Sequence, residues 1–226
     1  MSHLNQQLFC QRIKALFPDY FRNRSVLDIG GADINGSVKY LFRGCRYAVI
    51  DIWDGPGVDY VGSVSDLSNY QYGTVCCLEV AEHDQDYPVT IMEGIKRLKP
   101  GGLFLFTCAS ERRAEHGTRA TSPQDSPFTT DYYKNLTETD IRAISGFNEV
   151  WEWCWFEQKE TDLRFFGIKK GGESIRFRPS RIRWLRTYMD YWFTRRRKDI
   201  GEVIRRGPTS SEIYKALMES LKKEEK

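Results

Sequence analysis

The sequence has no Cys-x-x-Cys pair, no long apolar run and only three histidines. No apolar segment approaches the roughly 20 residues that span a bilayer, and residues 1–6 lack the basic and then apolar layout of a signal peptide. Three of the six cysteines lie inside apolar runs, which favours reduced, buried thiols over disulfides or a zinc site. We therefore expect a cytoplasmic protein without a transmembrane segment.

Charge is distributed unevenly along the 226 residues. Residues 174–226 hold 15 Lys/Arg and 7 Asp/Glu, net +8, whereas residues 1–173 hold 19 and 24, net −5. A hydrophobic content of 40% and an aromatic content of 14% are ordinary for a globular chain and argue against disorder. These differences predict a folded domain over residues 1–173 and a basic helical C-terminal extension over residues 174–226.

Strand and helix patterns alternate through the first half of the chain. Helical spacing of apolar residues predicts helices at 5–16, 37–41 and 88–98. Continuous apolar runs predict strands at 25–29, 46–52, 59–64, 74–80 and 102–108. Strands of this kind, separated by helices, are typical of a parallel sheet that is covered on both faces. The order of elements predicts an α/β, doubly wound fold.

The second half of the domain has a different residue pattern. Residues 109–131 form a long polar stretch, and a loop of this length inside a compact domain is usually functional. Thr137 and Asp140 match a capping box that starts another helix. Residues 147–157 and 163–168 predict a closing antiparallel hairpin. Its alternating tryptophans predict one sheet face packed beneath a helix, in preference to a sugar-stacking platform: Trp151, Trp153 and Trp155.

The most informative stretch is Val-Leu-Asp-Ile-Gly-Gly-Ala-Asp-Ile-Asn-Gly-Ser at residues 26–37. A strand that ends in an acid, a glycine-bearing turn and a second strand ending in Asp51 present a sheet edge to a nucleoside. Asp33 stands where dinucleotide enzymes need glycine, and its carboxylate would repel a diphosphate. The stretch therefore predicts an adenosine-containing cofactor with a positive centre, whose two ribose hydroxyls Asp51 would bind.

Five motifs in this order resemble those of class I S-adenosylmethionine-dependent methyltransferases over roughly residues 20–170. They are residues 26–31, 49–52, 65–67, 77–80 and 98–102. The resemblance implies a mostly parallel, seven-stranded Rossmann-like sheet with helices on both faces and S-adenosylmethionine as cofactor. The first motif departs from the family, because Ala32 and Ile34 replace its usual second and third glycines.

The same resemblance implies a role for each cofactor residue. Asp28 and Gly30 would face the methionine end of the cofactor, and Asp51 would bind the ribose. Residues 65–67 would contact the adenine, with Asp66 accepting a hydrogen bond from its amino group. The predicted cofactor-binding residues are Asp28, Gly30, Gly31, Asn35, Gly36, Asp51, Ile52, Ser65, Asp66, Leu67 and Glu79.

A narrower resemblance concerns the methyl acceptor. Residues 33–38, 115–118, 126–128 and 132–136 are similar to methyltransferases associated with glycan and polysaccharide modification. They imply an O-methyltransferase that acts on a hydroxyl of a sugar, a glycan or a similar small polar acceptor. Methyl transfer to a hydroxyl needs a group that takes its proton, and histidine is the side chain best suited to that task. The catalytic candidates are His116, favoured because its loop is long and polar, then His83, with Glu79.

Glu79, Glu82 and His83 also share the Glu-x-x-Glu-His spacing of ubiquinone-type O-methyltransferases. That resemblance implies a divalent metal, Mg²⁺ or Mn²⁺, held by these three residues. In the alternative interpretation, which we favour at this point, Glu79 contacts cofactor or substrate while Glu82 and His83 cap the next helix.

Two other functions stay open. An RNA or protein methyltransferase could hold its substrate with the basic extension, but residues 79–82 differ from the Asn/Asp-Pro-Pro-aromatic tetrapeptide of base N-methyltransferases, so nucleic acid is not the expected partner. The chain could also be a catalytically silent cofactor-binding scaffold. In the extension, residues 179–198 predict a basic amphipathic helix. We expect it to dock on the acidic body, with an anionic membrane surface, nucleic acid or an acidic partner as alternatives.

Overall fold

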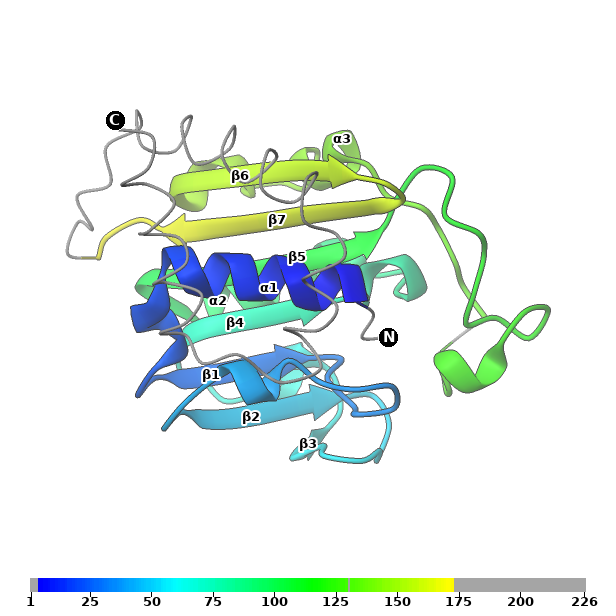
Figure 1. The fold of residues 1–226 in the computed structure, drawn as a ribbon, viewed down its shortest axis with the longest axis horizontal. Helices are drawn as coiled ribbons and strands as arrows, with labels where there is room; N and C mark the ends of the chain where they lie inside the picture. The colour runs from blue at the N-terminus through cyan, green and yellow to red at the C-terminus, as the bar shows by residue number, and fades with distance from the viewer. Residues whose placement is uncertain (1–3, 130, 173–226) are drawn as a thin grey trace, which may run out of the picture. The chain divides into compact units, whose positions relative to one another are not determined.

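The structure, a computed structural model, describes residues 4–129 and 131–172. Within these residues the chain forms a seven-stranded sheet in the order β3-β2-β1-β4-β5-β7-β6 (Figure 1). Strands β1 to β5 run parallel, and β7 pairs antiparallel with both β5 and β6. The doubly wound, mostly parallel sheet is therefore confirmed. Its elements are α1 (Leu4–Leu16), β1 (Ser25–Ile29), β2 (Arg46–Asp51), β3 (Tyr60–Val61), β4 (Tyr72–Leu78), α2 (Tyr87–Lys96), β5 (Leu98–Ala109), α3 (Glu138–Arg142), β6 (Trp151–Lys159) and β7 (Asp162–Lys169).

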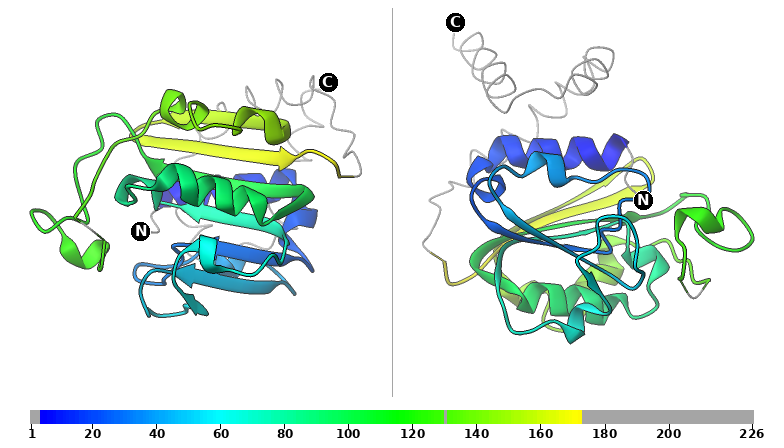
Figure 2. Two further views of the ribbon diagram at one scale, coloured as in Figure 1. Left: turned by 180° about the vertical axis from the view of Figure 1, so that it is seen from behind. Right: turned by 90° about the horizontal axis from the view of Figure 1, so that it is seen from below.

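Helices cover both faces of the sheet. Helix α1 lies on one face, and α2 and α3 lie on the other (Figure 2). Because side chains alternate along a strand, each central strand supplies apolar residues to both faces of the sheet, where they pack against the helices. Leu27 and Val75 belong to the core cluster that includes Ile91 and Ile95 of α2, whereas α1 buries Phe9 and other apolar residues. No helix among the described residues is long and apolar enough to cross a bilayer, and the cytoplasmic location stays a prediction.

Strand β3 is shorter than the sequence pattern predicts. Only Tyr60–Val61 pair with β2, although the apolar run predicts a strand over 59–64. Val64 already belongs to a short 3-10 helix, Val64–Asp66. The Ser63 side chain accepts from the Ser65 backbone N–H, and Asp66 accepts from the backbone N–H of Ser63, so this capping box turns the chain away from the sheet.

Two further boundaries differ from expectation. The helix predicted at 37–41 is a single 3-10 turn, Lys39–Leu41. Strand β5 begins at Leu98, where the sequence predicts the end of a helix, because Leu98 pairs with Tyr72 of β4. The capping box of Thr137 and Asp140 at the start of α3 is confirmed, with both of its hydrogen bonds present.

The closing hairpin is confirmed, but its tryptophans do not share one face. Trp151 packs against Phe165 at 5.1 Å between ring centroids, whereas Trp153 packs against Phe166 at 4.9 Å. Phe165 and Phe166 are neighbours in β7 and point to opposite faces of the sheet. The register shifts between Trp151 and Trp153, which breaks the alternation that the sequence pattern assumes. Both indoles pack in the protein, as expected, but the single-face prediction is wrong.

The predicted extension at 174–226, including its helix at 179–198, lies outside the described residues. Its boundary and its partners stay predictions.

Candidate active site

A cavity of about 430 Å³ opens at the carboxyl edge of the parallel strands. Its walls come from the turn after β1, the end of β2, residues 62–64 and the end of β4, and the long loop after β5 contributes residues 125–127. That loop projects from the same edge in Figure 1. An open parallel sheet binds its ligand at this edge, and the volume is that of a site for a small molecule.

The glycine turn after β1 forms one wall of the cavity. Gly30 has a φ of +65°, and a Cβ on it would lie 2.4 Å from Cγ2 of Val80, so only glycine fits there. Its backbone N–H donates to the carbonyl of Ile50 over 2.8 Å, which fixes the turn against β2. Six predicted cofactor residues of this turn and at the carboxyl end of β2 line the cavity: Gly30, Gly31, Asn35, Gly36, Asp51 and Ile52.

Asp28 and Asp51 line the cavity from two adjacent strands. The Asp51 carboxylate is oriented by the backbone, because it accepts from the N–H groups of Ala32 over 3.1 Å and Trp53 over 3.3 Å. Asp28 is buried and accepts from the Tyr47 hydroxyl over 2.6 Å. Burial raises the pKa of Asp28 to about 6, and the Tyr47 hydrogen bond opposes that shift.

The residues predicted to contact the adenine do not line the cavity. Ser65, Asp66 and Leu67 are absent from the cavity wall formed by the described residues, whereas residues 62–64 are part of it. Asp66 instead accepts from the backbone N–H of Ser63 over 2.9 Å. The Ser63-x-x-Asp66 capping pattern is the sequence signal that identifies this turn. The adenine role of residues 65–67 stays a prediction.

Glu79 stands at the end of β4 in an unusual backbone conformation. Its φ is +59°, which is rare for a residue other than glycine, and the strain of such conformations is concentrated at functional sites. The backbone N–H of Glu79 donates to the Thr107 carbonyl over 2.8 Å, which holds the conformation in place. The side chain is buried and lines the cavity.

Glu82 and His83 do not cap the following helix. They form the short 3-10 helix Ala81–His83, and both side chains are buried. The N-cap residue of α2 is Asp86, with no side-chain cap, and Asp84 accepts from the Asp86 backbone N–H. The capping interpretation of Glu82 and His83 is therefore wrong, because the chain makes a separate turn before α2 begins.

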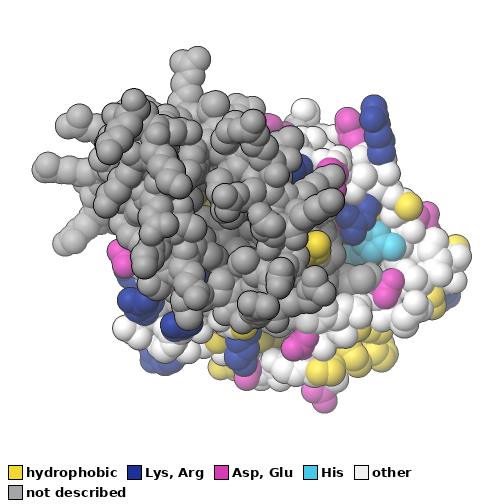
Figure 3. Space-filling view, viewed as in Figure 1, with side chains coloured by type: hydrophobic (Ala, Val, Ile, Leu, Met, Phe, Trp, Pro, Cys, Tyr) yellow, Lys and Arg dark blue, Asp and Glu magenta, His cyan; other side chains and the backbone are white. Residues whose placement is uncertain are grey.

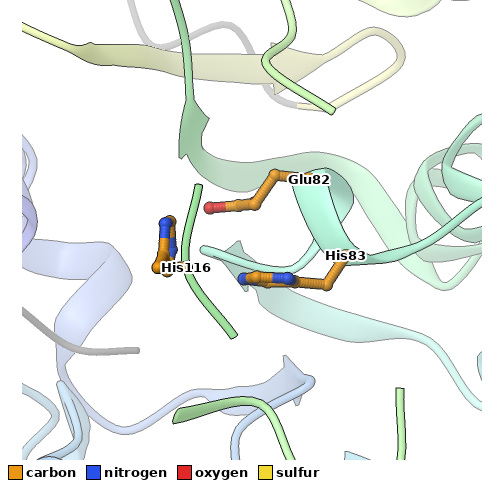
Figure 4. A group of neighbouring side chains, drawn as sticks. All are labelled: Glu82, His83 and His116. Carbon is orange, nitrogen blue, oxygen red and sulfur yellow. The ribbon is translucent and has the colours of Figure 1, made fainter. Parts of the chain in front are cut away.

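His116 joins these two residues from the loop after β5. Figure 4 shows its side chain directed toward Glu82 and His83, and one ligand atom from each of the three lies within 4.8 Å of the others. The rings of His83 and His116 meet nearly at right angles, with centroids 5.0 Å apart. Figure 3 shows histidine at the surface of this edge of the molecule. Glu79, which the sequence motif places in a metal set, is not a member of this group.

The three side chains, which we call the unpaired cluster, each hold a buried polar atom that the described residues leave without a partner. Glu82 Oε1 accepts from the Ala109 backbone N–H over 3.0 Å. Glu82 Oε2, His83 Nδ1 and His116 Nε2 are buried and have no hydrogen-bond partner among the described residues. His116 Nδ1 lies 3.2 Å from the Ala114 carbonyl, which fixes the proton on Nδ1 and leaves the lone pair on Nε2.

Burial determines the protonation of the unpaired cluster. It lowers the pKa of His83 to about 4, with a further contribution from His116, and it also lowers the pKa of His116. Burial, and then the neighbouring carboxylate of Glu79, raise the pKa of Glu82 to about 8. Both imidazoles are therefore neutral at pH 7, so their nitrogen atoms can accept a proton or ligate a cation.

The loop that carries His116 is held in place on both sides. Gly117 has a φ of +70°, and a Cβ there would lie 2.7 Å from Cε1 of His83. Arg113 forms an ion pair with Asp162 of β7 over 2.8 Å, and Asn135 donates to the Arg113 carbonyl over 2.9 Å. These contacts hold His116 against the ring of His83, although the two residues are 33 positions apart in the sequence.

Solved structures show the same fold. One of them is the 1,6-didemethyltoxoflavin-N1-methyltransferase of Burkholderia thailandensis, solved with 1,6-didemethyltoxoflavin and S-adenosylhomocysteine bound. It is 16% identical to this chain. The match covers 74% of this chain and 79% of that one, with a TM-score of 0.52. An O-methyltransferase family protein, also from Burkholderia thailandensis, is 10% identical, with coverage of 74% and 57% and a TM-score of 0.51. No curated protein matches the sequence.

The family assignment comes from the sequence itself. Residues 1–160 match the family model described as a methyltransferase domain, and this range contains every predicted cofactor residue. The cavity lies where the fold binds its cofactor, at the glycine turn and the acidic ends of β1 and β2. The chain belongs to the methyltransferase-domain family and is a methyltransferase that uses S-adenosylmethionine.

Proposed function

We propose that this methyltransferase acts on a hydroxyl of a sugar, a glycan or a similar small polar acceptor. The observation that supports an oxygen acceptor is the unpaired cluster beside the cofactor cavity. A neutral amine already carries the lone pair that attacks the methyl group. A hydroxyl must lose its proton, so a buried group with a free lone pair is needed at that position.

The reaction assigns a task to each part of the cavity. Asp51 would bind the ribose and Asp28 would face the methionine end of the cofactor, which would supply the methyl group. Glu79 and His83 line the same cavity, where the acceptor would bind. The hydroxyl oxygen forms a bond to the methyl carbon as the carbon–sulfur bond breaks, and the hydroxyl proton passes to Nε2 of His116, or to His83. The products are a methyl ether, S-adenosylhomocysteine and a protonated imidazole, and the acceleration comes chiefly from placement.

The charge of the cavity supports an uncharged acceptor. Asp84, Asp86 and Asp125 line it, together with Ser126 and Thr129. Carboxylates and hydroxyl groups offer hydrogen-bond acceptors to a polyhydroxylated ligand, whereas the carboxylates repel the phosphates of RNA. The described part of the chain therefore favours a small glycan partner over nucleic acid.

Transfer of a radiolabelled methyl group tests the proposal. The full chain is assayed with free glycans, nucleotide sugars and RNA, alongside His116→Ala and the surface control Lys96→Ala. We expect labelled methyl ethers of glycans, with a rate lowered about 10²- to 10⁴-fold in His116→Ala and unchanged in the control. Transfer to RNA alone would refute the proposal. Tight cofactor binding without transfer to any acceptor would favour the silent scaffold.

A further inference from the structure

We infer that Glu82, His83 and His116 form a binding site for a divalent first-row transition-metal ion, such as Mn²⁺, Fe²⁺ or Co²⁺. The site is built by two separate segments of the chain, the 3-10 helix after β4 and the loop after β5, whose side chains point toward one another in Figure 4. Carboxylate and imidazole ligands lie about 2.0–2.2 Å from such an ion, which places two donor atoms of one ion at most about 4.4 Å apart. The observed upper limit of 4.8 Å is a few tenths of an ångström larger.

Buried polar atoms without a partner are the first argument for a ligand at this position. Glu82 is fully buried, yet Oε2 has no partner among the described residues, and the same holds for His83 Nδ1 and His116 Nε2. A buried polar atom without a partner costs about 1–3 kcal/mol, so three of them in one place require an explanation. A single cation held by these three side chains would give the cluster a shared partner.

The chemistry of the donors is the second argument. Two imidazole nitrogens and one carboxylate oxygen suit Mn²⁺, Fe²⁺, Co²⁺ or Zn²⁺, whereas Mg²⁺ prefers oxygen ligands alone. Metal-binding histidines usually donate their second ring N–H to a carbonyl or carboxylate, and His116 does so toward Ala114. The backbone therefore fixes the His116 ring as metal sites require.

The third argument is the position of the site on the cavity wall. His83 lines the cofactor cavity, and three protein ligands leave coordination positions open for substrate. This step rests on the proposed function, because the open positions matter only if a hydroxyl binds beside the methyl donor. A cation there would occupy the imidazole lone pairs, so the two histidines would serve as its ligands and no longer as the base. It would lower the pKa of a hydroxyl that it binds, whose proton then passes to water. Two adjacent hydroxyls can occupy two open positions, so the acceptor class that fits best is a vicinal diol.

Metal binding to the full chain tests the site without any assay of activity. The protein is stripped with a chelator and titrated with Mn²⁺, followed by electron paramagnetic resonance, and with Co²⁺, followed by visible absorption. We expect one ion per chain, an affinity at least about tenfold weaker in Glu82→Gln, His83→Ala and His116→Ala, and no change in the exposed control Glu138→Gln. Thermal unfolding of every variant without metal shows whether it is folded.

The outcomes separate this site from the proposed function. Wild-type protein that binds no Mn²⁺ or Co²⁺, or variants that bind them as well as wild type, would overturn the site. Glycan methylation that continues unchanged in chelator would overturn the part of the ion in binding the acceptor, and it would leave the proposed function standing. Stoichiometric Co²⁺ binding that depends on both histidines supports the site, even if no hydroxyl acceptor is methylated, and in that case the proposed function alone fails.

Discussion

Two clusters of buried polar residues lie near the end of β5, and they differ in whether their side chains are paired. In the ion-pair network every charged group faces an opposite charge: Arg12, Arg113, Glu157, Asp162 and Arg164. In the unpaired cluster of Glu82, His83 and His116, each residue keeps a buried atom without a partner. Ala109 joins the two, since it pairs with Asp162 in the sheet and donates to Glu82.

The difference separates stability from function. A buried charge that has lost its partner destabilises a fold strongly, so the ion-pair network holds α1, β6, β7 and the loop at Arg113 together. The charged groups of the network are paired with one another. Arg164 also keeps a buried Nε without a partner among the described residues, but a guanidinium offers only hydrogen-bond donors and has no lone pair for a ligand. The unpaired cluster contributes little to the stability of the fold, because its atoms are desolvated without a compensating hydrogen bond. The same atoms can bind a ligand for that reason. The pairing of charges in one group, and the acceptor chemistry of the unpartnered atoms in the other, therefore support opposite roles for the two neighbours.

The sharpest test of this comparison, with the largest expected effect, is Arg164→Met. Arg164 is 2% exposed and pairs with Glu157 over 3.3 Å and with Asp162 over 3.1 Å. Its loss leaves two carboxylates with one cation each, and we expect the free energy of unfolding to fall by about 3–5 kcal/mol. Urea unfolding measures the change. The control Arg142→Met breaks an exposed pair with Glu138 and should cost about 1 kcal/mol or less. Equal losses in the two variants would contradict the structural role of the network.

A smaller effect is expected from Gly117→Ala, which probes the unpaired cluster without removing any of its polar atoms. The new Cβ would lie 2.7 Å from Cε1 of His83, so the loop must move away from that ring. We expect the rate of methyl transfer to fall about 10- to 100-fold, a change of about 1.4–2.7 kcal/mol in the activation free energy.

Gly146→Ala is the matched control for this variant. Gly146 also has a positive φ, of +79°, but a Cβ there would meet nothing closer than Cε of Met92 at 3.5 Å. Both variants carry the same type of backbone strain, about 1–3 kcal/mol, and only Gly117→Ala crowds a histidine. Similar activity in the two variants would show that the position of the loop at His83 does not matter for catalysis.

The sequence was sufficient to predict the parts of the molecule that depend on local patterns. Continuous apolar runs placed the central strands, and Asp28, Gly30 and Asp51 followed from the way a parallel sheet ends. The capping box of Thr137 needed only four consecutive residues. In each case, the physical cause lies within one element or at the end of one strand.

What could not be predicted depends on contacts between distant segments or on the exact register. His116 reaches Glu82 and His83 only because the loop after β5 folds back against the turn after β4, and no local pattern encodes that approach. The register shift beside Trp153 depends on how β6 pairs with β7. Motif spacing therefore identified Glu82 and His83 as candidates, but their grouping with His116, in place of Glu79, required the fold.

The smallest expected effect concerns Asp28. This buried carboxylate accepts one hydrogen bond, from the Tyr47 hydroxyl, so it is neither ion-paired like the network nor without a partner like the unpaired cluster. Its pKa is raised to about 6 by burial, so the folded, cofactor-free protein carries Asp28 protonated below that pH and ionised above it. The positive charges of S-adenosylmethionine favour the carboxylate. We therefore expect the affinity for the cofactor to rise by several-fold, less than about tenfold, between pH 5 and 7, as calorimetric titration would show.

Asp28→Asn isolates this effect from other titrating groups, because it keeps the shape of the side chain and removes its proton equilibrium. The variant should bind the cofactor with an affinity that varies less with pH, and it should also change stability in a definite direction. A carboxyl with a raised pKa stabilises the fold fully below its ordinary value of 3.8, and that contribution is lost as the pH rises through about 6. Above pH 6 the cofactor-free variant should thus unfold at a higher temperature than wild type, whereas near pH 4 the difference should shrink. A wild-type affinity that does not rise between pH 5 and 7 relative to the variant would place Asp28 outside the reach of the cofactor's charges.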